Sequence, residues 1–454
     1  MPHSRVRAVA ANSRLGRRFQ SLHANHRRIA SGALTIAALT LLAKAFVAGR
    51  EVAIAYRYGV SATVDAYQLS LTIVTWVPML LSSVLTVVLV PRLISLDGRK
   101  DKRAAFISEF NGSVFLLGGV VALITFLAAP IAAQLMAARL GPATLQMTTS
   151  LVERMAPVAL FMIAAGYLTT RLQAKERFGY TVTEAVPAIM IALLVAGPFG
   201  LPGILPLILG TVFGYFAQVL ILSRLVVRGD PPLGGLSIRH RSDEWRTFYG
   251  SILLMFSGQL VIMATIPIDQ WFAARIGEGA VATLGYANRI VTLFTGLAGV
   301  VVGRALLPVL SRTVAEGDVN VGRRQSLQWA GLMFCAAVAG SLVLWIAAPE
   351  LVKLLFERGA FQADATAAVS NVLQYGLIQM PFYFGGIALV QWMAATGRFK
   401  DIVWITAVAL ATKVLLNVIL VPNFGLRGIM ISSAVMYLVT SMLMAAKISR
   451  GATS

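Results

Sequence analysis

Three long runs without Asp, Glu, Lys or Arg constrain the fold of this chain more than any other feature. They are Phe110–Ala138, Gln325–Pro349 and Ala365–Gly397, and each contains at least 25 residues. A helix rises about 1.5 Å per residue, so roughly 20 apolar residues cross the ~30 Å hydrocarbon layer of a membrane. Lipid offers no partners to backbone amides, and such runs must therefore be helical. Only 13% of all residues are charged, about half the share in soluble domains. The sequence predicts an all-α polytopic membrane protein.

Four short motifs occur twice in the same order, which indicates an internal duplication. The offset between the copies grows only from 218 to 225 residues; the pairs are "YRYG" and "ARIG" (from 56 and 274), "LAAP" and "IAAP" (127 and 346), "ERF" and "GRF" (176 and 397), and "FGLPGI" and "FGLRGI" (199 and 424). We therefore predict two homologous lobes. The expected divisions are a basic arm (1–30), an N-lobe with helices one to six (31–227), a connector (228–245) and a C-lobe with helices seven to twelve (246–454).

Turn signals between the apolar stretches predict about twelve transmembrane helices, six in each lobe. Their estimated centres lie at Leu41, Ser83, Val120, Met162, Ile191, Phe213, Met263, Gly296, Val338, Phe384, Val408 and Tyr437. Because six is even, both lobes enter the membrane from the same side. They should be parallel repeats related by an axis along the membrane normal.

The distribution of basic residues predicts the orientation. If the N-terminus and every even-numbered loop are cytoplasmic, those segments hold 27 of the 39 Lys and Arg, and the opposite loops hold six. The positive-inside rule expects such a bias, so both termini and the connector should be cytoplasmic. The net charge of +20 then reflects topology and contact with anionic membrane lipids rather than a nucleic-acid partner. The arm reads as a cytoplasmic segment and not as a cleaved signal peptide.

No motif for catalysis or cofactor binding is present in the sequence. Cys335 is the single cysteine, and the four His lie in the arm and the connector, which argues against a disulfide framework and a metal cluster. No phosphate-cradling glycine loop or Ser/His/Asp set occurs. We therefore expect a protein that is not an enzyme and that has no cofactor.

Several charges fall inside the expected helices, where each costs at least ~2.5–3.5 kcal/mol unless it faces the bundle interior. Lys44 lies about a dozen residues into the first span, and Glu51 follows two helical turns later on the same stripe. Arg50 is next to Glu51, and Arg289 lies inside the eighth span, in the other lobe. We predict a cationic cavity between the lobes that binds an anionic group, with purely structural ion pairs as the alternative.

Further acids lie at comparable positions, and two interpretations remain open for them. Asp65 and Asp269 are candidates for cavity or coupling acids, beside Glu51. Asp269, Glu109 and the basic Lys413 also lie near estimated helix ends, from which a side chain can extend to the interface.

Two stretches carry a resemblance to a known family. The segment "LLAKAFVAGREVAIAYRYGVSATVDAYQLS" from Leu41 resembles the first helix and second-helix entry of MviN/MurJ-type lipid II flippases. The segment "LGYANRIVTLFTGLAGVVVGRALLPVLSR" from Leu284 resembles their eighth helix, and "LFERGAFQADAT" from Leu355 resembles the segment before their tenth. These proteins belong to the multidrug/oligosaccharidyl-lipid/polysaccharide exporter superfamily.

The resemblance implies two six-helix bundles that form a V around a central cavity. In that family, basic residues of the first and eighth helices hold the diphosphate of the lipid, and the matching positions here are Lys44, Arg50 and Arg289. The family's acids match Glu51 and Asp65. The chain departs from the family in having Lys44 and Glu51 where Arg and Asp are usual, and Asn288 where an acid is usual. Members commonly have fourteen helices rather than twelve.

The predicted function is that of a flippase in a bacterial inner membrane. It would move a polyprenyl-diphosphate-linked saccharide, lipid II-like or an exopolysaccharide or O-antigen unit, from the inner to the outer leaflet by alternating access. The membrane potential or a gradient of H⁺ or Na⁺ would drive it. The alternatives are an H⁺- or Na⁺-coupled multidrug exporter of the same superfamily, a membrane glycosyltransferase and a scaffold that has lost transport. A cationic cavity argues against the exporter, and the short connector argues against the glycosyltransferase.

The predicted topology can be tested by cysteine labelling of intact cells. After replacement of Cys335, single cysteines placed in Phe199–Gly203 or Phe424–Gly428 should react with a membrane-impermeant reagent from outside. Cysteines in the connector should react only after the membrane is opened. Labelling of the connector in intact cells would contradict the orientation and the count of helices together.

Overall fold

The structure is a computed structural model that describes residues 39–230, 234–240, 242, 245, 255–256, 258–316 and 318–450. The basic arm (1–30) lies outside these residues, as does part of the connector. Within the described part the regular structure is helical, as the sequence predicts.

The N-lobe begins with a helix over residues 39–58, in which Lys44, Arg50 and Glu51 are helical. The helices that follow are α3 (Ala62–Ser95), α4 (Lys100–Leu127), α5 (Ala129–Ala137), α6 (Pro142–Met155), α7 (Pro157–Ala174), the 3₁₀ helix η1 (Phe178–Glu184), α8 (Ala185–Ala196) and α9 (Leu205–Gly229).

The C-lobe begins with helical residues 258–263. Its further helices are α11 (Thr265–Ala274), α12 (Ala280–Ala315), α13 (Val319–Phe356), α14 (Ala363–Leu377), α15 (Met380–Ala395), α16 (Phe399–Phe424) and α17 (Leu426–Arg450).

The described helices group into twelve rods in the predicted order when helices separated by a short break are counted together. Several breaks coincide with proline, which lacks the amide proton that continues a helix. Pro130 begins α5 after α4, and Pro157 begins α7 after α6 at a bend of 48°. Eight helices are individually long and apolar enough to cross a membrane, or nine if the bent pair is one span, among the residues described.

Backbone conformation supports the duplication independently of sequence letters. Gly200 and Gly425, the matched glycines of the repeated "FGL" turns, have φ of 61° and 56°. Glu176 and Gly397, matched in "ERF" and "GRF", have φ of 54° and 72°. Glu176 is a residue that pays a steric cost in the left-handed region, so its position reflects the shared turn rather than its own preference.

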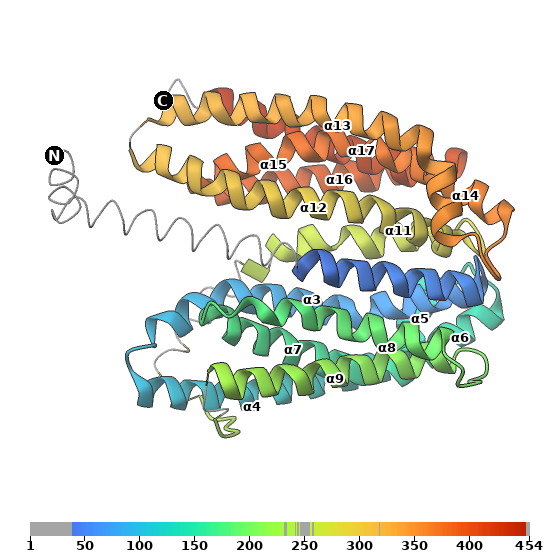
Figure 1. Cartoon of the computed structure of the whole chain (residues 1–454), viewed down its shortest axis with the longest axis horizontal. Coiled ribbons are helices and arrows are strands. Elements are labelled where there is room, and N and C mark those ends of the chain that lie inside the picture. Colours follow the sequence, from blue (N-terminus) through green and yellow to red (C-terminus); the bar gives the residue numbers. More distant parts are fainter. Residues whose placement is uncertain are drawn as a thin grey trace, which may run out of the picture.

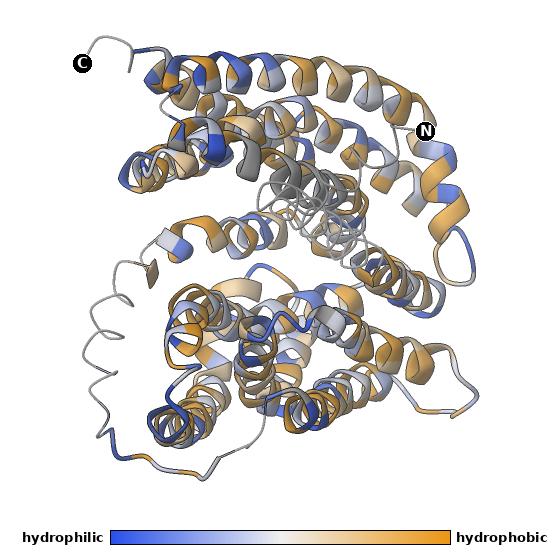
Figure 2. Ribbon diagram, turned by 60° about the vertical axis from the view of Figure 1, so that its left-hand side comes forward, coloured by the Kyte–Doolittle hydropathy of each residue, from blue (hydrophilic) through white to orange (hydrophobic). Residues whose placement is uncertain are grey.

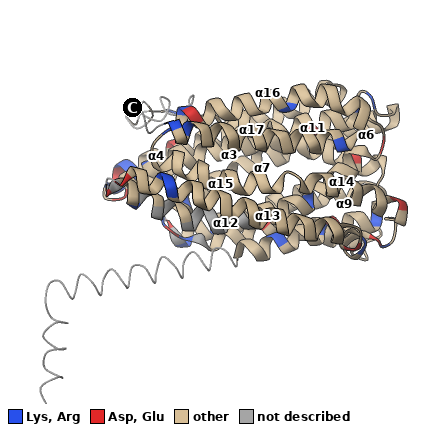
Figure 3. Cartoon of the chain, turned by 90° about the horizontal axis from the view of Figure 1, so that it is seen from above, with Lys and Arg blue, Asp and Glu red and all other residues tan. Residues whose placement is uncertain are grey.

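The two lobes form a V whose arms meet at one end of the molecule. In Figure 1 the helix 39–58, α11 and α12 lie between the bundles, and the outer helices diverge toward the left. Hydrophobic residues cover much of the helical surface in Figure 2. Leu116 and Ile346 are 54% and 82% exposed, as expected of side chains that face lipid. Figure 3 shows that Lys, Arg, Asp and Glu gather at the two ends of the bundles, with a few in between.

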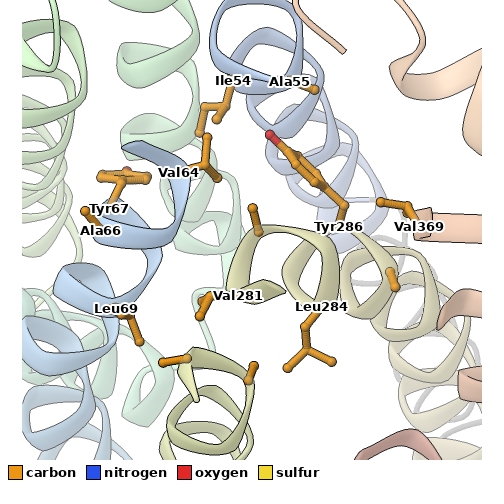
Figure 4. Packing of buried hydrophobic residues seen from close by; sticks show 14 of the residues in the cluster. Ile54, Ala55, Val64, Ala66, Tyr67, Leu69, Val281, Leu284, Tyr286 and Val369 are labelled. Carbon is orange, nitrogen blue, oxygen red and sulfur yellow. The ribbon is translucent and has the colours of Figure 1, made fainter. Parts of the chain in front are cut away.

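One buried core joins the lobes near the apex of the V. Ile54 and Tyr67 of the N-lobe belong to the same packed cluster as Val281, Leu284 and Tyr286 of α12, as Figure 4 shows. Tyr286 is fully buried, and its hydroxyl donates to the carbonyl of Gly59 across the lobes at 3.0 Å. The apex is therefore a packed contact rather than a point where two surfaces merely touch.

The connector packs against α4 at the opposite, predicted cytoplasmic, end. The amide of Ser237 donates to the carbonyl of Ser108 at 3.0 Å. The indole of Trp245 donates to Glu109 Oε2 at 2.8 Å. Glu109 is 6% exposed, so it is buried by the connector rather than extended to the interface. The chain thus leaves the N-lobe along a fixed path.

An aspartate at the end of α9 holds three helices together at the same end. Asp230 is 2% exposed and pairs with Arg171 of α7 at 3.0 Å and with Arg103 of α4 at 2.6 Å. Nearby, Lys175 hydrogen-bonds to Asp97 in the α3–α4 loop and holds the pKa of that carboxyl below its ordinary value. Removing Asp230 would leave two buried guanidinium groups without their acid.

We expect Asp230→Ala to destabilise the protein by about 3–5 kcal/mol, because it breaks a buried ion pair on one side only. Asp401→Ala is the matched control, since Asp401 pairs with the exposed Lys447 at 2.7 Å. That exposed pair should contribute at most about 1 kcal/mol. Unfolding of both variants in detergent micelles measures the difference, and equal losses would contradict the structural role of Asp230.

Candidate functional site

A cavity of about 430 Å³ lies between the two lobes. Its lining comes from both halves of the duplication: the helix 39–58, α3, α7 and α9 on one side, and α11, α12, α17 and Gln379 on the other. The charged residues that line it are Arg50, Arg289 and Asp269. The remaining polar lining consists of amides, hydroxyls and an indole: Gln68, Thr72, Thr75, Trp76, Tyr215, Thr265, Gln270, Asn288, Thr292, Thr295, Gln379, Ser433 and Tyr437.

Two arginines from different lobes share one carboxylate at this cavity. Arg50 forms an ion pair with Glu51 Oε1, and Arg289 Nε lies 3.1 Å from the same oxygen. Glu51 is 4% exposed, whereas the side chain of Arg289 is 43% exposed. The structure therefore brings together three predicted site residues. Their net charge is +1, and Arg289 retains donors that face the cavity.

Lys44 lies on the other side of the same arginine. It lines a smaller pocket of about 130 Å³ together with Glu51, Arg289, Leu355 and Phe356. A side-chain carbon placed on Gly296 of α12 would lie 3.6 Å from Lys44 Nζ, so the ammonium sits against that helix. Lys44 is thus near the cluster but does not line the central cavity.

Asp65 lies outside both pockets, in contrast to its candidate role as a cavity acid. It is fully buried in the first turn of α3, and its carboxylate accepts from the amides of Gly279 and Ala282, the latter at 2.6 Å. These amides open α12, where unpaired N–H groups and the helix dipole favour an anion. Asp65 therefore joins the lobes rather than lining the passage.

Further contacts at the same end form a seam between the lobes. The amide of Ala360 donates to the carbonyl of Tyr56 at 2.8 Å, and Thr144 donates to Glu278 at 2.7 Å. A side-chain carbon on Gly59 would lie 2.4 Å from the carbonyl oxygen of Ala360. All these residues follow odd-numbered helices, so the seam closes the end that the charge distribution places outside.

Asp269 lines the cavity, but it is already paired. It lies 3.0 Å from the ammonium of Lys413, whose side chain has no exposed surface. Sequence position alone left extension to the interface open for both residues, and the structure excludes it. Within the described part of the chain, no three His, Cys, Asp or Glu side chains gather as a metal site would require.

Comparison with known proteins identifies the family. Residues 54–452 match the family described as lipid II flippase MurJ. The chain belongs to this MurJ family. A lipid II flippase MurJ of Burkholderia cenocepacia is 26% identical over 90% of the chain and 82% of that protein. A probable MurJ of Rhizobium tropici is 32% identical, but over only 35% of the chain and 30% of that protein.

Solved structures show the same fold. A lipid II flippase MurJ in an inward closed conformation superposes with a TM-score of 0.79 and 16% identity, covering 92% of this chain and 87% of that one. An inward-facing multidrug MATE transporter of the same superfamily gives 0.75 and 15% identity, covering 94% and 99%. The V of two helical bundles is therefore confirmed, and the MurJ assignment rests on the sequence match.

We expect Gly59→Ala to weaken the seam, because the added methyl group would collide with the carbonyl of Ala360. Gly200→Ala is the matched control: Gly200 has φ of 61°, close to the 60° of Gly59, but no atom lies within 4 Å of its added carbon. A penalty of about 1 kcal/mol for the closed state shifts a two-state ratio about five-fold. Labelling from outside of a cysteine at Thr72, in the cavity, should rise with Gly59→Ala and not with Gly200→Ala. Equal labelling of the two variants would contradict the seam.

Proposed function

We propose that this protein is a flippase that moves a polyprenyl-diphosphate-linked saccharide from the inner to the outer leaflet of a bacterial inner membrane. One observation carries the proposal: Arg50 and Arg289, one from each lobe, converge on a single carboxylate at a cavity between the lobes. Family membership supports lipid II or a related lipid-linked saccharide as the passenger.

The passenger's diphosphate would compete with Glu51 for the arginines. Phosphate oxygens accept bidentate hydrogen bonds from guanidinium groups as a carboxylate does, and they carry more charge. Arg289 is the accessible partner, so it would turn to the diphosphate first and release its contact with Glu51. Because that contact joins the helix 39–58 to α12, binding would change how the lobes are held together. Lys44, one side pocket away, would add a point charge.

Alternating access would follow from opening the seam while the cytoplasmic side closes. The neutral amides and hydroxyls of the cavity are suited to the hydroxyl groups of a sugar, and Trp76 and Tyr215 offer aromatic faces. An inside-negative membrane potential favours the outward movement of an anion by ~2.3 kcal/mol per charge at 100 mV. Both termini would lie in the cytoplasm, and anionic lipids would contact the basic loops.

A multidrug exporter for organic cations is the alternative within the superfamily. Its cavity should offer acidic side chains to a cationic drug, whereas two arginines line this one and its single acid is paired with Lys413. The charge of the cavity therefore supports an anionic passenger.

We expect Arg50→Ala and Arg289→Ala to reduce translocation at least about ten-fold, since each removes a charge-assisted contact worth ~1.5–3 kcal/mol. Lys44→Arg should retain activity because it keeps the charge. The measurement is translocation of a fluorescent polyprenyl-diphosphate saccharide in proteoliposomes.

Arg358→Ala controls for a general loss of positive charge, because this arginine contacts only its own turn among the bonds described, at Leu354, outside both pockets. It should translocate at the wild-type rate. Wild-type rates from both cavity variants would remove the diphosphate site from the mechanism.

A further inference from the structure

A lysine is enclosed inside the C-lobe, away from the arginine cluster. Lys413 of α16 is 0% exposed, and its ammonium nitrogen lies 3.0 Å from each carboxylate oxygen of Asp269 on α11. It also hydrogen-bonds to the hydroxyl of Ser433 on α17. One positive charge thus joins three helices of one lobe.

The groups around this charge are oxygen donors directed toward it. Ser433 gives its own proton to the carbonyl of Ile429 at 3.0 Å, so its oxygen must accept from Lys413. Asn417, one turn beyond Lys413, is fully buried, and neither atom of its amide has a hydrogen-bond partner within the described chain. A carboxylate, a hydroxyl and a free amide oxygen are the ligands that a small hard cation prefers.

The duplication shows that this arrangement is specific to the C-lobe. At the offset of 218 residues that relates "YRYG" to "ARIG", Asp269 corresponds to Glu51. Lys413 falls between the offsets of 221 and 225, where the N-lobe reads "AIMIA" over residues 188–192. The N-lobe acid is neutralised by arginines at the cavity, and the C-lobe acid by a lysine within its own lobe.

We propose that Lys413 is a resident cation, whose ammonium occupies a site that the oxygens of Asp269, Ser433 and Asn417 would otherwise offer to a mobile monovalent cation such as Na⁺. The consequence, which rests on the proposed function, is that the transport cycle proceeds without Na⁺ binding at this site. Asp269 is the only acid among the described residues that line the central cavity, and Lys413 neutralises it. A mobile cation therefore finds no unpaired carboxylate there.

The test is to remove the ammonium and ask whether Na⁺ replaces it. Lys413→Ala should lower the melting temperature in choline buffer and regain stability in Na⁺, whereas the wild type should melt at the same temperature in both. At a Na⁺ concentration 100 times the dissociation constant, binding alone predicts a shift of several degrees. The purified full-length chain in detergent is sufficient, and no passenger is needed.

Matched variants separate a Na⁺ site from a general salt effect. Lys413→Arg keeps the charge and should show no Na⁺ response, and Lys413→Ala combined with Asp269→Asn should lose the response of the single variant. If Lys413→Ala does not fold, Lys413→Ser provides a second small side chain for the same measurement. No Na⁺ response in a folded small variant would overturn the proposal, as would Na⁺-specific stabilisation of the wild type.

Transport by the wild type gives a second reading. In proteoliposomes with an imposed membrane potential, replacing Na⁺ by choline on both sides should change the translocation rate less than about two-fold. A strict requirement for Na⁺ would overturn the proposal. Absence of translocation under all conditions would count against the proposed function, while the thermal measurement would still decide the role of Lys413.

Discussion

The structure depends on the inability of lipid to hydrogen-bond with a charge or a backbone amide. A charge within the membrane must find its partner inside the protein, and here the partners lie on other helices. Glu51 takes a guanidinium from the opposite lobe, Asp65 takes the first amides of α12, and Lys413 takes a carboxylate from α11. Each pairing therefore fixes the position of one helix against another. A few charged residues determine contacts that apolar packing, which is similar against lipid and against protein, specifies less strongly.

The two kinds of contact between the lobes differ in what could replace them. At the seam, backbone groups meet directly: the carbonyl of Tyr56 accepts from Ala360, and Gly59 leaves no space for a side chain. An anionic ligand cannot substitute for such a contact, so the seam opens only when the lobes move. At the cavity, Glu51 and Arg289 meet through side chains, and a phosphate can take the place of the carboxylate. The lobes are thus held by one contact that a passenger can compete for and by another that responds to its loss.

The sequence alone was sufficient for the fold because its strongest signals are local. Uncharged runs define the helices, and the repeated turns at Gly200 and Gly425 reproduce the same backbone conformation. The convergence of Arg50, Glu51 and Arg289 was also predictable, since helical spacing and burial cost both direct them to the interior. Asp65 was not placed correctly, because the pattern gives its depth but not the neighbouring helix end that it caps. Lys413 and Asp269 are 144 residues apart, and no local pattern reveals that pairing. The neutral lining of the cavity, such as Gln68 and Gln270, likewise has no signature against other polar helical residues.

The duplication explains why the two acids of the cavity region have different chemistry. Glu51 and Asp269 occupy corresponding positions in their lobes, so an ancestral repeat would have offered one carboxylate from each side. In the N-lobe the carboxylate is held by two arginines, one of them 43% exposed at its side chain, and its partner can be exchanged. In the C-lobe it is held by a lysine with no exposed side chain, and exchange would require the lobe to open. A passenger that enters the cavity therefore meets one responsive lobe wall and one fixed wall. Because the same fold position carries both, the asymmetry arises from the neutralising cations, Arg289 and Lys413, rather than from the acids.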